Sequence, residues 1–85
     1  MKNPLEEKRK KIDALDVRLA GLLERRFSVA RSLTGLKKKI RDPRREAAVL
    51  KRAAGLVKDR ALRPAVTAVY RELIRQSRLL QREPR

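Results

Sequence analysis

Apolar residues recur every three or four positions in the first half of the chain, at Ile12, Leu15, Leu19, Leu22, Val29, Leu33, Leu36 and Ile40. This spacing is typical of one face of a long α-helix that packs on neighbouring helices. Proline is acceptable in a first helical turn. The pattern therefore predicts a helix from about Pro4 to about Lys39, roughly 54 Å long at about 1.5 Å per residue.

One position of this apolar stripe is charged, because Arg26 falls between Leu22 and Val29. Burying an unpaired guanidinium is costly, and no carboxylate lies one turn away on the stripe. Two interpretations follow. The side chain extends to solvent or to a distant acid, or the stripe opens into a polar pocket in which Arg26 binds an anion.

Two further helices are predicted. The second begins at Asp42-Pro43, where Asp42 suits an N-cap and Pro43 suits the first helical position. The third begins near Pro64. Alanine, leucine, arginine, lysine and glutamate dominate, and β-branched or aromatic runs are missing. Residues 1–85 are therefore expected to form one all-α domain with three helices, the first long, the second short and the third of medium length.

A helix of this length cannot be covered by two helices of about 15 and 20 residues from the same chain. Another surface must bury the rest of the apolar stripe. A second copy of the chain is the simplest candidate, which predicts an intertwined helical homodimer.

The chain has no cysteine and no histidine. Zinc sites, disulfides, thiol nucleophiles and an imidazole base are therefore not expected, and no metal or other cofactor is predicted. No apolar run is long enough to span a bilayer, and the N-terminus lacks the apolar core of a signal peptide. A cytoplasmic protein is the expectation.

The formal net charge of +15 is compatible with two kinds of anionic partner. Nucleic acid is one, but Phe27 and Tyr70 are the only aromatic residues that could stack on bases. A small anionic ligand is the other, because a basic surface raises its encounter rate. Charge alone leaves both open, and the shortage of aromatic residues makes nucleic acid the weaker candidate.

Polar residues interrupt the apolar stripes of all three predicted helices. Lys37 follows Arg26 by eleven residues, three helical turns, so that both would project from nearly the same face. Glu46 begins the stripe of the second helix, and Ser77 and Gln81 lie one turn apart on the third. Each has an ordinary structural explanation, but their joint occurrence indicates a shared polar site.

Arg9 precedes Arg26 by 17 residues, which is about 25 Å along a helix and about 100° round it. It cannot meet Lys37 of its own chain at one small ligand. In an antiparallel dimer, Arg9 could instead reach the pocket of the partner.

These residues resemble the all-helical class of chorismate mutases, and the resemblance runs from Leu5 to Gln81. It rests on an ordered set of motifs: Arg9-x-x-Ile12-Asp13-x-Leu15-Asp16, Leu22-Leu23-x-x-Arg26, Lys37, Asp42-Pro43-Arg44-Arg45-Glu46 and Ser77-x-x-x-Gln81. The family implies a three-helix protomer in an intertwined dimer with two active sites. It also implies the conversion of chorismate to prephenate.

The resemblance also implies roles for single residues. Arg26 and the partner's Arg9 would hold the two carboxylates of the substrate. Lys37 and Gln81 would donate hydrogen bonds to its ether oxygen, and Glu46 would accept one from the ring hydroxyl. Two further implied contacts are Ser77 with the Asp42 backbone at a carboxylate, and Arg45 as an additional pocket arginine.

This chemistry needs no nucleophile, metal or acid–base pair, because the reaction is a unimolecular pericyclic rearrangement. The protein must hold a flexible dianion in its reactive shape and stabilise charge as the ether bond breaks. Fixed cations and hydrogen-bond donors suffice. At position 81, a glutamine can donate at neutral pH, whereas a carboxyl must first be protonated.

The sequence departs from the family between Lys37 and Asp42, which are five positions apart, whereas family members usually have a longer connection. A shorter connection is expected to end the first helix earlier or to leave the pocket more open. The alternatives are isochorismate-pyruvate lyase, an amino-deoxychorismate mutase, since Glu46 would pair with an amine too, or a basic dimer that binds nucleic acid. An enzyme of the same pathway is a candidate partner.

Overall fold

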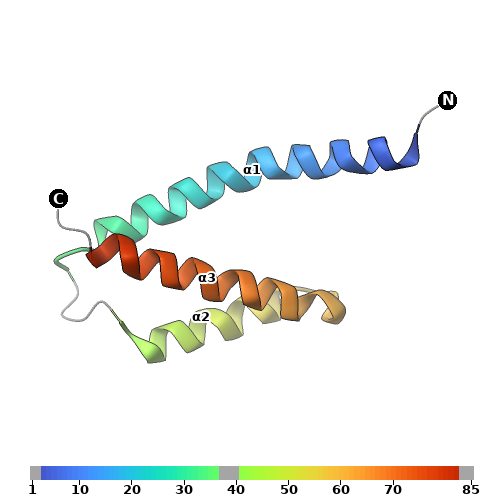
Figure 1. Cartoon of the computed structure of the whole chain (residues 1–85). Coiled ribbons are helices and arrows are strands. Elements are labelled where there is room, and N and C mark those ends of the chain that lie inside the picture. Colours follow the sequence, from blue (N-terminus) through green and yellow to red (C-terminus); the bar gives the residue numbers. More distant parts are fainter. Residues whose placement is uncertain (1–2, 37–40, 83–85) are drawn as a thin grey trace.

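The computed structural model describes residues 3–36 and 41–82, and this part of the chain contains helices and no strand. The elements are α1 (Pro4–Ser32), α2 (Pro43–Leu56), the short 3-10 helix η1 (Arg60–Leu62) and α3 (Arg63–Arg82) (Figure 1). The predicted all-α fold with three α-helices is confirmed. The 3-10 turn before α3 was not predicted.

The first two helices have side-chain caps at their N-terminal ends, of which the cap at Asp42 was predicted. The Asn3 side chain accepts hydrogen bonds from the backbone N–H groups of Leu5 and Glu6, at 2.9 and 3.4 Å, and Pro4 occupies the first turn of α1. The Asp42 side chain caps α2 by accepting from the N–H of Arg45 at 3.1 Å. Each cap satisfies donors that have no partner within the helix.

The prediction that the first helix continues to about Lys39 was wrong, because α1 ends at Ser32. Ser32 Oγ donates to the carbonyl of Val29, a local bond that competes with helix propagation. The following N–H groups of Leu33 and Thr34 bond three residues back, which tightens the last turn. Gly35 then adopts φ +88°, a left-handed conformation that ends helices. The first helix therefore ends before Lys39, which is one of the two outcomes expected from the short connection between Lys37 and Asp42. Lys37 lies outside the described residues.

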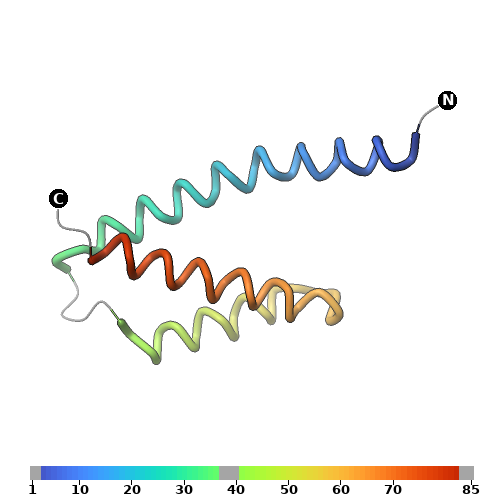
Figure 2. Tube along the Cα trace, viewed as in Figure 1, coloured from blue at the N-terminus to red at the C-terminus, as the bar shows by residue number. Residues whose placement is uncertain are grey.

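Helix α3 lies at the centre of the fold. In residues 3–36 and 41–82, α1 and α2 each contact α3 but not each other. Helices α1 and α3 run side by side in the same direction, whereas α2 returns antiparallel to α3 (Figure 2). Arg63 Nε donates to the Val57 carbonyl at 2.8 Å and thereby links the end of α2 to the start of α3.

The single chain buries little apolar surface. Among the described residues, Ala53 and Ile74 are the buried apolar side chains and Gln81 is the buried polar one. The radius of gyration is 16.2 Å, against about 12 Å for a compact chain of this length. The N-terminal half of α1 extends beyond α2 and α3 (Figure 1). The described part of the single chain thus lacks the large core that normally stabilises a domain.

Candidate active site

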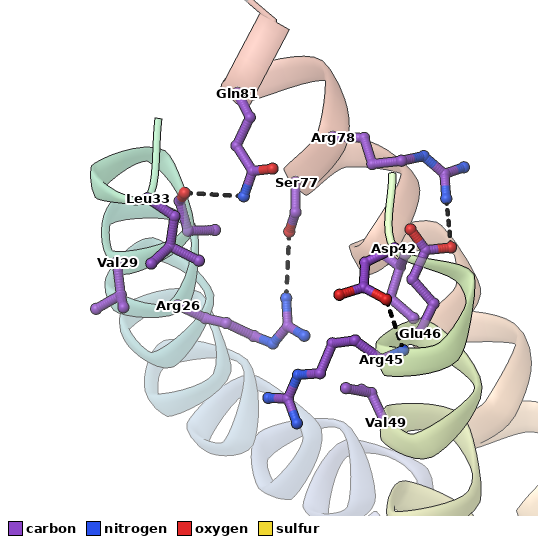
Figure 3. Close-up of a pocket in the computed structure, with 12 residues that line it drawn as sticks. Arg26, Val29, Leu33, Asp42, Arg45, Glu46, Val49, Ser77, Arg78 and Gln81 are labelled. Carbon is purple, nitrogen blue, oxygen red and sulfur yellow. Dashed lines mark hydrogen bonds and ion pairs between the residues drawn. The ribbon is translucent and has the colours of Figure 1, made fainter. Parts of the chain in front are cut away.

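A cavity of about 420 Å³ lies between α1 and α2, over the C-terminal half of α3 (Figure 3). All three helices contribute to it because the C-terminal ends of α1 and α3 and the N-terminal end of α2 meet there (Figure 1). Its lining consists of Arg26, Val29, Ala30, Leu33, Asp42, Arg45, Glu46, Val49, Ile74, Ser77, Arg78 and Gln81.

Arg26 reaches into this cavity from α1 (Figure 3). Its Nη1 donates to Oγ of Ser77 at 3.3 Å, and its guanidinium lies 5.8 Å from the centre of the Tyr70 ring, within the range of a cation–π contact. Ser77 Oγ in turn donates to the Leu73 carbonyl at 2.7 Å. The stripe does open into a pocket with polar lining at Arg26. Within residues 3–36 and 41–82, Arg26 forms no ion pair with an acid.

The face of α1 that packs on α3 differs from the predicted one. The half-buried residues near the C-terminal end of α1 are Leu23, Arg26, Phe27 and Ala30, which share one helical face. Of these, only Arg26 belongs to the predicted apolar stripe. The other stripe residues within α1 are each more than half exposed in the single chain: Ile12, Leu15, Leu19, Leu22 and Val29.

The N-terminal end of α2 forms the opposite wall. The Asp42 carboxylate faces the cavity while it caps the helix, and the Arg45 side chain extends toward Arg26 (Figure 3). Glu46 Oε1 accepts a hydrogen bond from Nη1 of Arg78 at 2.6 Å, a charge-assisted contact between half-buried side chains. The positive end of the α2 dipole points into the same space and favours an anion there.

Gln81 closes the end of the cavity near the C-terminus of α3. Its side chain is 7% exposed, and Nε2 donates to the Ala30 carbonyl of α1 at 2.9 Å. Ala30 is in the last turn of α1, and its carbonyl also accepts from the N–H of Leu33, so Gln81 is a second donor to it. The bond fixes the amide between the two helices.

The structure brings together most of the residues that the sequence predicted as a site. Six of them line the cavity: Arg26, Asp42, Arg45, Glu46, Ser77 and Gln81. Lys37 lies outside the described residues. The helical phase that related it to Arg26 does not apply, because α1 ends at Ser32. Sequence analysis missed Arg78, although an acid on an apolar stripe such as Glu46 signals that a cation should lie nearby.

Arg9 does not line the cavity of its own chain. It is exposed near the far end of α1, where its Nη1 lies 3.5 Å from Oε1 of Glu6. Leu5 and Ile12 lie about one turn to either side of it, and both are more than half exposed. Arg9 therefore lies beside the N-terminal end of the uncovered apolar stripe.

The cavity is suited to an anion larger than a single inorganic ion. Its lining has three arginines and two carboxylates, which leaves one net positive charge. Apolar side chains such as Val29, Leu33 and Val49 form part of the wall and could contact a ring or a vinyl group. In the described part of the chain, no group of three or more acidic, cysteine or histidine residues could hold a metal ion, and no helix is long and apolar enough to cross a membrane.

The fold and the site together define a small helical protein with a pocket between its helices that three arginines help to line. The sequence model of the family described as chorismate mutase type II matches residues 8–82. The chain belongs to this family. No curated protein and no solved structure gives a significant match.

Proposed function

We propose that this protein is a chorismate mutase that rearranges chorismate to prephenate. The observation that carries the proposal is the convergence of Arg26, Arg45, Ser77 and Gln81, with Glu46 opposite, on one cavity in a chain of the chorismate mutase type II family. These groups offer fixed positive charge, hydrogen-bond donors and one acceptor. A unimolecular rearrangement of a dianion requires this combination.

The positive groups of the cavity would bind the carboxylates of the substrate. Arg26 donates to Ser77 and lies over the Tyr70 ring, so its guanidinium is already oriented before a ligand arrives. Planar guanidinium groups match carboxylates geometrically. Arg45 lies on the other side of the cavity (Figure 3). A substrate held between them would have its reacting ends brought together, which removes much of the entropic barrier.

Charge on the breaking ether bond would be stabilised by Gln81 and Lys37. The bond from Gln81 to Ala30 fixes the plane of the amide. Lys37, by family resemblance, would supply the cation at the same oxygen. Donors that are already oriented where charge develops give the largest catalytic effect. Glu46 would accept the hydrogen bond of the ring hydroxyl.

We further propose that the active form is a homodimer. Six exposed apolar residues of α1 occur at spacings of three, four and seven, at Leu5, Ile12, Leu15, Leu19, Leu22 and Val29, and Val17 is a further exposed residue outside this pattern. This is the pattern of a helix that packs on another helix. Because α1 contacts only α3 among the described elements, this face requires a further partner, and a second α1 offers a matching stripe.

The charge of the cavity supports a contribution from the second protomer. One net positive charge on the described lining is less than a dianion needs. Arg9 lies beside the uncovered stripe of α1, where a partner could accept it. The partner's Arg9 and this chain's Lys37 would together raise the charge to match the substrate. We expect the compartment to be the cytoplasm.

The test is the loss of chorismate absorbance with purified protein, followed by identification of the product. Prephenate supports the proposal, whereas release of pyruvate from isochorismate supports a lyase. Lys37→Ala should lower kcat at least as much as affinity, because it removes an interaction that strengthens in the transition state. Lys38→Ala is the matched control and should keep turnover.

Binding to duplex DNA should be titrated with salt in parallel, because the net charge of +15 also suits nucleic acid. A protein that functions on nucleic acid would bind DNA at physiological salt and leave chorismate unchanged. That result would refute the proposed function.

A further inference from the structure

The ion pair between Glu46 and Arg78 separates two cavities of the protomer. On one side is the candidate active site. On the other is a groove of about 410 Å³ between α2 and α3. Glu46 and Arg78 line both. In Figure 3, the guanidinium of Arg78 lies on the side of Glu46 that faces away from Arg26.

In the described part of the chain, the other charged groups that line the groove between α2 and α3 are not paired with Glu46. Arg75 is paired with Glu72, with Nη2 and Oε2 2.6 Å apart. Hydrogen bonds from Arg75 and Gln76 lower the pKa of Glu72, so this acid is ionised and engaged with Arg75. Arg41 and Arg71 also line the groove and are exposed. Arg78 is the cation that the structure pairs with Glu46, at 2.6 Å.

This pairing changes what the Glu46 carboxylate can bind. A carboxylate has about four acceptor positions, so Glu46 can still accept a hydrogen bond from a hydroxyl while it bonds Arg78. Its negative charge, however, is already offset by the guanidinium. A cationic group placed beside Glu46 would be repelled by Arg78, and also by the Arg26 and Arg45 charges in the same cavity.

We infer that Arg78 is a specificity-determining residue: it makes Glu46 an acceptor for a neutral hydroxyl and disfavours an ammonium group at that ring position. The inference rests on the proposed function and selects among its alternatives. An aliphatic amine is protonated at neutral pH. Chorismate carries a hydroxyl at this position, whereas amino-deoxychorismate carries an amine, so the Glu46–Arg78 pair favours chorismate.

The experiment compares the two ligands at wild-type and variant sites. The Michaelis constant for chorismate and the inhibition constant of amino-deoxychorismate against chorismate turnover are measured for each protein. Their ratio reports the preference for the hydroxyl, whether or not the amine is itself converted. Arg78→Gln removes the charge but keeps a donor, Arg78→Met removes both, and Arg78→Lys keeps the charge. Arg75→Gln, on the same helix but outside the active-site cavity, is the matched control.

The wild-type protein should prefer chorismate. Arg78→Gln and Arg78→Met should reduce that preference by about tenfold, because each removes one like charge near the amine. Arg78→Lys and Arg75→Gln should retain it. Circular dichroism tests whether each variant is folded. If Arg78→Gln does not fold, Arg78→Met provides the comparison with the wild-type protein.

An unchanged preference in a folded neutral variant would overturn the inference while leaving the proposed function intact. A loss in Arg78→Lys as large as in Arg78→Gln would do the same, because side-chain shape rather than charge would then decide. If the wild-type protein does not turn over chorismate at all, the proposed function fails and the inference fails with it.

Discussion

Arg26 and Ser77 are 51 positions apart in the sequence and are joined by a hydrogen bond of 3.3 Å between α1 and α3. The Ser77 hydroxyl donates its own hydrogen bond to the Leu73 carbonyl and so acts as an acceptor toward Arg26. The guanidinium is therefore held in place by an oriented acceptor and by the Tyr70 ring. In the part of the chain that the structure describes, no carboxylate forms an ion pair with it. An arginine held in this way is prepared to bind an anion.

Arg26→Ala should lower kcat/KM for chorismate by at least about 100-fold, because it removes a pre-oriented cation at the substrate. Helix content should be retained, and stability should change little or rise, since a half-buried cation is removed. Turnover, circular dichroism and thermal unfolding measure these effects. Arg25→Ala, at an exposed neighbouring position, is the control. If Arg26→Ala unfolds the protein while Arg25→Ala does not, Arg26 has a structural role instead.

Gln81→Glu should make turnover depend on pH. A carboxyl donates a hydrogen bond only when protonated, and burial disfavours its charged form. Activity should be low near neutral pH and should rise as the pH falls, because the protonated fraction increases. The measurement is kcat/KM from about pH 5 to about pH 8, with the wild-type protein as the reference.

The same pH dependence in the wild-type protein would contradict a role for Gln81, because an amide does not titrate in this range. Gln76→Glu is a further control. Gln76 lies on the same helix, bonds Glu72 and does not line the cavity, so the variant should not acquire the acid-dependent activity.

Local patterns predicted the helices well, because caps and proline act on neighbouring residues. Asp42 and Pro43 marked the start of α2 correctly. The polar residues on apolar stripes identified the cavity, because a polar group at a packing position needs a polar surrounding. The roles of these residues, and the dimer, remain predictions.

Two features depended on information that periodicity does not contain. The end of α1 at Ser32 is decided by local bonds and by Gly35, whereas the apolar spacing continues past it. Arg78 is one of 25 lysines and arginines, and only the packing of α3 against α2 places it at Glu46. A sequence pattern identifies faces of one helix but not the pairings between helices.

The dimer should be obligate or nearly so, because one protomer leaves the stripe of α1 exposed and buries few side chains. Leu19→Gln with Leu22→Gln should weaken dimerisation and lower thermal stability together, since apolar burial stabilises both. Light scattering over a range of concentrations measures the first effect. The matched control is Leu56→Gln, because Leu56 is also exposed but lies at the end of α2. A wild-type protein that is a folded monomer at micromolar concentration would contradict this prediction.

Arg9 should act on the partner's site. It lies about 25 Å from Arg26 along α1, outside its own cavity, and beside the stripe that a second protomer would cover. Arg9→Ala and Arg26→Ala homodimers should therefore each be nearly inactive, because every site lacks one arginine. Lys10→Ala, next to Arg9 and exposed, should remain active as the control.

Mixing the two inactive variants should restore activity only if Arg9 works across the interface. A heterodimer then has one site with both arginines and one site with neither. Random reassembly after unfolding makes about half of the dimers mixed, so about a quarter of all sites should regain wild-type turnover. Heterodimer formation is verified by tagging one variant and isolating the mixed species. If verified heterodimers remain as inactive as their parents, Arg9 does not contribute to the site of the partner, and the missing positive charge must come from another residue.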